Sequence, residues 1–445
     1  MKKGLILPLL LVTLSGCAIN SAFINYPSQL APVKAELNSN TPLEGLDSLT
    51  SKISGNDGLL YAQEAGRVAQ IGGDFKASKA FYQQAVSDYI DFDDKATISL
   101  SDTGATASSL LINDNVIPYR GPGYERIMLH QYQALNYIFS QDYEGALVEV
   151  RRSNELQSTE QARYEESNKS VQAMDNGTIN TEMSKLSQAA GSTTSAFLNA
   201  YSYYTTGVLH EVLGEPNDAF IDYRKAAQIS PNNRYLQQDL VRLAKQLAMP
   251  QYDEFKRRWG EAVFPTKNQG QVIFLIERGF VPAKQSFTVP FPISGKWQSI
   301  SLATYPSRDP LVRPARIQGV GPLLQAAPIA EISALAITAL KEDLPAALAR
   351  QVARVYAKSL LAKNTSDWGS VAIQIFNLIT EQADRRSWLT LPQQAQIARK
   401  YINPGQYNIQ LDNSSPTQIN VESGRTTLIW AIDTGNYTRF YSTII

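Results

Sequence analysis

The sequence predicts an α+β protein, with an all-helical N-terminal half built from repeats and a C-terminal domain that mixes strands and helices. Three observations support this prediction. Apolar residues recur at helical spacing through residues 58–260. Short apolar runs between Pro and Gly, typical of strands, occupy residues 271–304 and 407–443. A second stretch of helical spacing, residues 323–398, lies between them, so one domain (residues 261–445) would form its sheets from both groups of strands.

Composition excludes several classes of function. The chain has 445 residues, and a length of roughly 100–200 residues per domain predicts two or three domains. The 41 basic residues equal the 41 acidic ones, so the charge gives no indication of nucleic-acid binding. A single Cys and two His exclude a disulfide framework and argue against a zinc site. We therefore expect no metal and no cofactor.

The N-terminus has the pattern of a secretory signal peptide over residues 1–16. Lys2 and Lys3 precede an apolar run from Gly4 to Leu14, which ends in small residues. This run is too short for a membrane span of about 20 residues.

The sequence L-S-G-C, which ends at Cys17, resembles the lipobox of bacterial lipoproteins. The resemblance implies that the signal is cleaved before Cys17 and that this residue becomes acylated, since several acyl chains anchor a protein stably. Ala18 follows, rather than an aspartate that would resemble an inner-membrane retention signal. This implies the periplasmic leaflet of the outer membrane. The alternative is an ordinary signal peptide followed by an unrelated cysteine.

Residues 17–57 are predicted to form a lipidated tether. Pro27, Pro32 and Pro42 stand among Asn, Ser and Thr, and apolar periodicity is weak.

The best-preserved repeat, Ala200–Asn233, resembles the 34-residue tetratricopeptide repeat, a helix–turn–helix unit. Its small residues would let two helices cross closely, and its proline would end the second helix. The residues that carry the match are Gly207, Gly214, Ala219, Tyr223, Ala226 and Pro231.

A second unit begins at Leu59, and a weaker third unit begins at Ile127 with Gln141 at the position of the turn glycine. Stacked repeats need neighbours to cover their apolar faces, so we expect the intervals Asp91–Arg126 and Glu155–Ser195 and the C-terminal half to provide cover. The matching residues of the second unit are Gly66, Gly73, Tyr82 and Ala85.

Motifs for catalysis are absent from the sequence, and we predict no enzymatic activity. It contains no G-x-S-x-G, S-x-x-K or H-E-x-x-H pattern and no phosphate-binding loop. His130 and His210 fall within repeat helices, where packing is the favoured role. Paired carboxylates have no sequence signature, so hydrolysis of glycosides stays open.

One candidate binding face is basic. Arg350, Arg354 and Lys358 recur every four residues and would share a helix face suited to an acidic partner, a glycan or a lipid head group. In the nearby A-D-R-R-S-W stretch, the favoured interpretation is that Asp384 pairs with an arginine and that Trp388 packs in the core.

Four stretches resemble signatures of an uncharacterised family of tetratricopeptide-repeat-containing bacterial envelope lipoproteins. They are Asn113–His130, Ala146–Arg152, Ala349–Arg354 and Ala383–Pro392. The resemblance implies a location and an architecture, and it implies no activity. Members are often encoded beside small lipoproteins similar to activators of penicillin-binding proteins, which suggests cell-wall assembly by association.

We therefore expect an outer-membrane lipoprotein that faces the periplasm and binds another envelope protein in the groove of its repeats. Contact with the membrane would be through the lipid anchor only, and nucleic acid would not be a partner. One alternative is a glycan-binding or glycan-processing protein that uses the basic face. Another is a structural subunit of a larger envelope machine.

Overall fold

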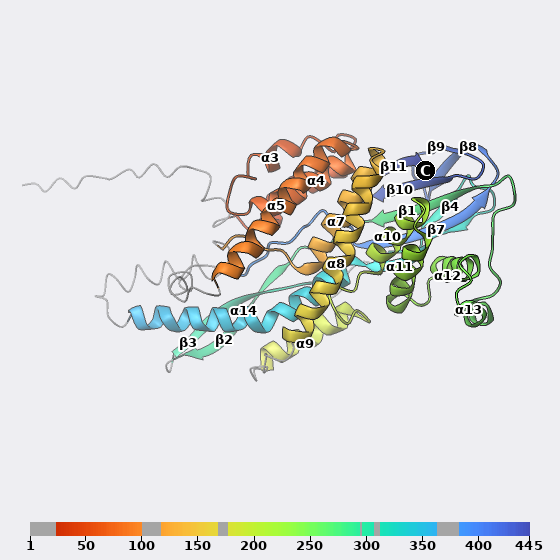
Figure 1. The fold of residues 1–445 in the computed structure, drawn as a ribbon. Helices are drawn as coiled ribbons and strands as arrows, with labels where there is room; N and C mark the ends of the chain where they lie inside the picture. Colours follow the sequence, from red (N-terminus) through yellow and green to blue (C-terminus); the bar gives the residue numbers. More distant parts are fainter. Residues whose placement is uncertain (1–23, 100–116, 168–176, 294–295, 307–311, 363–381) are drawn as a thin grey trace, which may run out of the picture.

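The computed structural model describes residues 24–99, 117–167, 177–293, 296–306, 312–362 and 382–445 (Figure 1). The signal peptide and Cys17 lie outside these ranges. The described part is mixed α and β, as the sequence predicts.

The expected tether is folded from residue 26 onward, which corrects the prediction for residues 17–57. Helix α2 spans Tyr26–Leu37, and a short helix α3 spans Leu46–Thr50. Pro27 occupies the first turn of α2, where its missing N–H needs no partner. The buried side chains of α2 recur at helical spacing and form one apolar stripe: Tyr26, Leu30, Val33 and Leu37.

Three antiparallel helical hairpins follow. They are α4 (Gly58–Ile71) with α5 (Phe75–Ser99), α7 (Gly123–Phe139) with α8 (Tyr143–Ser167), and α10 (Ala200–Val212) with α11 (Pro216–Ile229). Three further helices are α9 (Gly177–Ala190), α12 (Arg234–Gln246) and α13 (Tyr252–Trp259).

Two of the hairpins cross at a glycine. A Cβ on Gly66 would lie 2.3 Å from the ring of Tyr82, and one on Gly207 would lie 2.7 Å from the ring of Tyr223. The tyrosine ring of the second helix therefore fills the space that a larger residue would need at these positions.

The C-terminal half forms a five-stranded sheet in the order β11-β10-β1-β7-β6. Strand β1 pairs in parallel with β10 and antiparallel with β7, so both predicted groups of strands enter one sheet, as expected. The strands of this sheet are β1 (Gly270–Arg278), β6 (Ala327–Glu331), β7 (Gln394–Ile402), β10 (Thr426–Asp433) and β11 (Thr438–Ile444).

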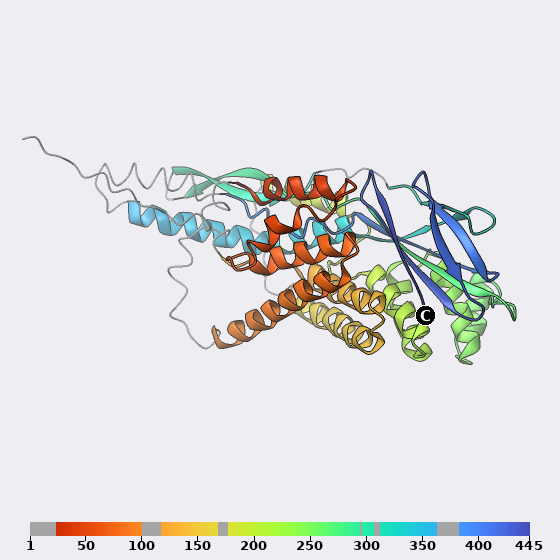
Figure 2. The same cartoon turned by 90° about the horizontal axis from the view of Figure 1, so that it is seen from above.

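A second sheet has the order β5-β4-β8-β9, and β2 pairs with β3 in a separate hairpin. Figures 1 and 2 show this hairpin and the long helix α14 (Ile332–Ala362) extending together away from the sheets. The remaining strands are β2 (Gln285–Ile293), β3 (Lys296–Thr304), β4 (Arg316–Gln318), β5 (Leu324–Gln325), β8 (Gly405–Leu411) and β9 (Thr417–Val421).

The predicted helical block, residues 323–398, is wrong at both ends, where β5, β6 and β7 are strands. The run Ile397-Ala398 followed by Ile402 fits helical spacing as well as a strand, and pairing with β1 on one side and β6 on the other decides for the strand. Residues 363–381 of this block lie outside the described residues.

The predicted boundary near residue 260 does not divide the hydrophobic core. One continuous cluster of buried side chains includes residues from α2, the three hairpins and the five-stranded sheet. Trp430 of β10, for example, stacks on Tyr132 and Phe139 of α7 at ring-centroid distances of 6.0 and 5.9 Å. The helical and C-terminal halves therefore pack as one body.

Candidate functional site

A stretch of the protein itself, residues 384–391, covers the facing surfaces of α4, α5 and α7, and we call it the central segment. Its Trp388 is fully buried, and its ring lies edge-on to Tyr82 and Tyr132 at 5.8 and 5.9 Å. The interpretation that Trp388 packs in the core is confirmed. The open groove expected for a partner is therefore occupied along α4 and α7.

Two buried carboxylates hold the backbone of the central segment. Glu64 on α4 accepts hydrogen bonds from the amides of Leu389 and Thr390, at 2.7 and 3.2 Å, and Glu125 on α7 accepts one from the amide of Trp388, at 2.9 Å. Burial raises the pKa of both carboxyls, and it raises that of Glu64 to about 7. No spacing rule relates residues 64 and 125 to residue 388, so sequence reasoning missed this contact.

An ion-pair network fixes the start of the central segment. Arg386 pairs with Asp384 at 2.7 Å and with Asp57, and it donates to the carbonyl of Ile117 at 2.8 Å. The expected pairing of Asp384 with an arginine is thus confirmed. Burial alone would raise the pKa of Asp384, but the Arg386 guanidinium holds it below its ordinary value.

Further buried ion pairs join the helices to the sheet. Arg67 of α4 pairs with Glu277 of β1, and the hydroxyl of Tyr201 donates to the same carboxylate at 2.9 Å. Arg399 of β7 pairs with Glu211 of α10 at 2.6 Å. The C-terminal half therefore supplies the opposite charges for Arg67 and Glu211 of the helices.

The two histidines contact carboxylates within the helical half. His130 lies 2.6 Å from Glu149, and Nδ1 of His210 lies 2.7 Å from Glu215. Ligand atoms of His210, Glu215 and Asp218 lie within 4.8 Å of one another, a spacing that suits a metal ion. Arg151 already pairs with Glu215 at 3.1 Å, so this carboxylate has a protein partner of its own.

The predicted basic face is not continuous. Arg350 is exposed and lies 3.4 Å from Asp343, whereas Arg354 is 2% exposed. The side chain of Lys358 lies outside the described residues. Arg354 belongs to the interior of the helix packing, which corrects the expectation of a shared exposed face.

Arg350 instead lines a cavity of about 560 Å³ beside the central segment, which we call the charged cavity. Three of the four stretches that prompted the resemblance meet there: residues 117–124, Arg350, and Asp384 with Arg386. Pro122, Tyr305, Ala336, Ala339 and Leu340 form its apolar walls.

Basic residues outnumber acidic ones in this lining, with four against two. Arg350 and Arg386 pair with the two acids, Asp343 and Asp384. Lys284 was not predicted as a site residue, because it stands before β2 without any motif around it. Its Nζ donates to the carbonyl of Arg386 at 2.9 Å. Lys284 and Arg120 are the two basic residues in excess, so the cavity suits a carboxylate carried on an apolar segment.

Within the described ranges, the helices are all too short or too polar to cross a bilayer. No protein-family model matches the chain, and no curated protein sequence matches it.

Proposed function

We propose that this protein is an outer-membrane lipoprotein that faces the periplasm and binds an acidic segment of another envelope protein in the charged cavity. The observation that carries the proposal is the meeting of three of the stretches that prompted the resemblance at one cavity with an excess of basic residues. Steered by charge, an acidic segment would dock its apolar side chains against the walls.

The repeat architecture supports the proposal. Each helical hairpin has a turn residue with positive φ at the position expected for a tetratricopeptide-type repeat: Gly73, Gln141 and Gly214, at 84°, 60° and 88°. Such hairpins commonly serve as scaffolds for partners. Because the central segment covers the facing surfaces of α4, α5 and α7, we place the partner at the charged cavity rather than in the repeat groove.

The lipid anchor would hold the folded body close to the membrane. Tyr26, where α2 begins, is nine residues after Cys17, a reach of about 30 Å at most. Changing Cys17 to Ser should release the protein from the membrane fraction, and mass spectrometry of the wild-type N-terminal peptide should find acyl chains. An unmodified Cys17 in the membrane-bound protein would contradict the anchor.

Site-specific photo-crosslinking in intact cells tests the partner site. A crosslinking amino acid at the exposed Arg120 should give a discrete adduct with one envelope protein, whereas the same group at Trp297, 75% exposed on β3, should not. Lys284→Glu should abolish that adduct by reversing the charge of the cavity. Lys267→Glu is the matched control, because it makes the same charge change on an exposed loop. Equal loss of the adduct in Lys284→Glu and Lys267→Glu would rule out the charged cavity as the partner site.

A further inference from the structure

We propose a second, independent binding site, for an oligosaccharide, in a cavity of about 710 Å³ between the helical and C-terminal halves. Residues from α8, the loop before α10, α11, β6 and the start of α14 line this polar cavity. The volume lies within the range of about 300–1,000 Å³ that is typical of small-ligand sites. The site goes beyond the partner binding proposed above.

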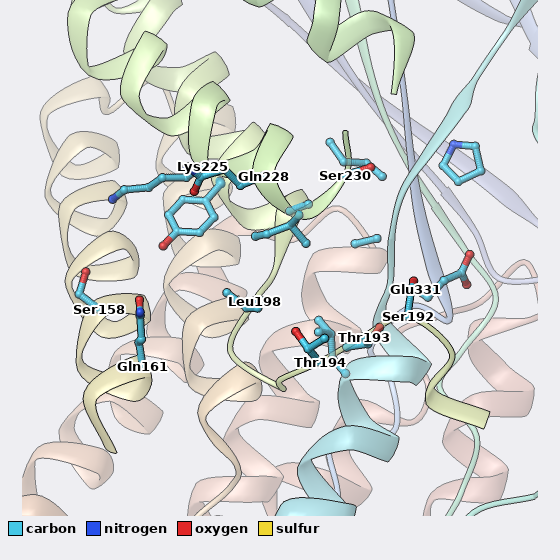
Figure 3. A pocket seen from close by; sticks show the side chains of 17 residues that line it. Ser158, Gln161, Ser192, Thr193, Thr194, Leu198, Lys225, Gln228, Ser230 and Glu331 are labelled. Carbon is cyan, nitrogen blue, oxygen red and sulfur yellow. The ribbon is translucent and has the colours of Figure 1, made fainter. Parts of the chain in front are cut away.

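Hydroxyl and carboxamide groups dominate the polar lining. Figure 3 shows Ser158 and Gln161 on the α8 side, Gln228 on α11, and Thr193 and Thr194 on the loop. Hydroxyls and amides both donate and accept hydrogen bonds, as sugar hydroxyls do. In the described part of the chain, five lining side chains make no hydrogen bond to protein, and so remain available to a ligand: Ser192, Thr193, Thr194, Gln228 and Ser230.

An aromatic ring and several apolar side chains complete the lining. Tyr203 is 8% exposed, and burial raises the pKa of its phenol to about 12, so the group stays neutral and able to donate. Nζ of Lys225 lies 5.1 Å from the centre of this ring. Leu198, Ile329 and Leu335 add apolar surface. A sugar ring matches such a lining because it presents apolar C–H faces and polar edges.

The charge of the polar cavity disfavours an acidic or phosphorylated ligand. Lys225 and Glu331 are the charged residues of its lining, one of each sign. Figure 3 shows them at opposite ends. The charged cavity, with its excess of basic residues, provides the contrast within the same protein.

An extended peptide fits this site less well than a sugar. Strand β6 is the edge of the five-stranded sheet and lines the cavity, where a peptide could add as a further strand. However, Asn233 already donates to the carbonyl of Pro328 at 2.9 Å, Pro328 has no N–H, and the strand bulges before Ala330. These features interrupt the hydrogen-bond ladder that a peptide would need.

Isothermal titration calorimetry tests the site. The full-length protein in mild detergent is titrated with cellotetraose, chitotetraose and maltotetraose. We expect at least one sugar to bind. Gln228→Leu and Thr194→Val should each weaken its binding about tenfold, the effect of losing one good hydrogen bond. Both residues are exposed, so the fold should tolerate the changes, which thermal melting would verify.

Arg350→Ala, in the charged cavity, is the matched control and should leave sugar binding unchanged. The proposal is overturned if none of the three sugars binds at millimolar concentration, or if tetra-alanine binds and they do not. It is also overturned if Gln228→Leu and Thr194→Val both bind the sugar as tightly as the wild type does. None of these outcomes affects the crosslinking test, so the two proposals fail separately.

Discussion

At the scale of single residues, Gln141 is strained at the turn of the second hairpin. Its φ of 60° lies in the left-handed region, which costs a non-glycine residue about 1 kcal/mol, whereas the corresponding turns carry Gly73 and Gly214. We predict that Gln141→Gly raises the free energy of unfolding by about 0.5–1 kcal/mol in urea denaturation.

The matched control is Gly214→Ala. A Cβ there would have no atom within 4 Å, so the change adds backbone strain without a clash. It should lower the free energy of unfolding by a similar amount. A loss of stability in Gln141→Gly would contradict the account of the turn.

Glu64 makes stability depend on pH. Burial raises its pKa from 4.5 to about 7, so the folded state holds this proton more tightly than the unfolded chain does. The stability that this bound proton contributes is fully present below about pH 4.5 and is lost as pH rises through 7. The free energy of unfolding should therefore fall between pH 5 and 8, by up to about 3 kcal/mol from this group.

Glu64→Gln should flatten this decline, measured by urea denaturation at several pH values. Glu211 is the control of opposite sign, because Arg399 and Arg242 lower its pKa to about 2 against the effect of burial. Its contribution is present above pH 4.5 and is lost in acid, so Glu211→Gln should change the slope only below pH 4.5. An unchanged slope from pH 5 to 8 in Glu64→Gln would refute the assignment.

At the scale of elements, the central segment is the piece around which α4, α5 and α7 pack. Trp388→Ala would leave a void between Tyr82 and Tyr132, and such truncations of buried aromatic residues cost about 3–5 kcal/mol. Trp297→Ala removes the same side chain from an exposed site on β3 and should change stability by less than about 0.5 kcal/mol. Equal effects in chemical denaturation would contradict the role of the segment.

The elements differ in how well local pattern predicts them. Strands β1, β8, β9, β10 and β11 lie within the two predicted groups, residues 271–304 and 407–443, to within two residues, since their apolar runs are bounded by Gly, Pro or Asn. Strand β7 was missed because its pattern fits a helix equally well. The packed start of the chain was missed because proline and polar residues hide the stripe of α2.

The candidate sites were predictable only in part. The sequence singled out Arg350 and the stretch around Asp384, which line the charged cavity. It gave no indication of Lys284, and it could not foresee that Arg354 is buried. The polar cavity draws on isolated Ser, Thr and Gln residues from several elements, which carry no motif.

At the scale of the whole molecule, the helical and C-terminal halves depend on each other. Without the C-terminal half, Glu64, Arg67 and Glu125 would lose the partners that the central segment and β1 supply. We predict that residues 24–260 alone do not unfold cooperatively, because an exposed apolar face and unpaired charges would remain. Thermal melting followed by circular dichroism, for this fragment and for the full chain, measures whether the fragment unfolds cooperatively. A sharp transition at the temperature of the full chain would show that the halves are independent.

The sequence by itself determined the hairpins and most strands, because helical spacing, alternation and turn residues act over a few neighbouring positions. It also determined the small residues where helices cross, since close approach demands them. Only the tertiary structure decided what fills the helical groove and where cavities remain. Those outcomes depend on contacts such as Glu64 with Leu389, which join residues more than 300 positions apart and follow no local rule.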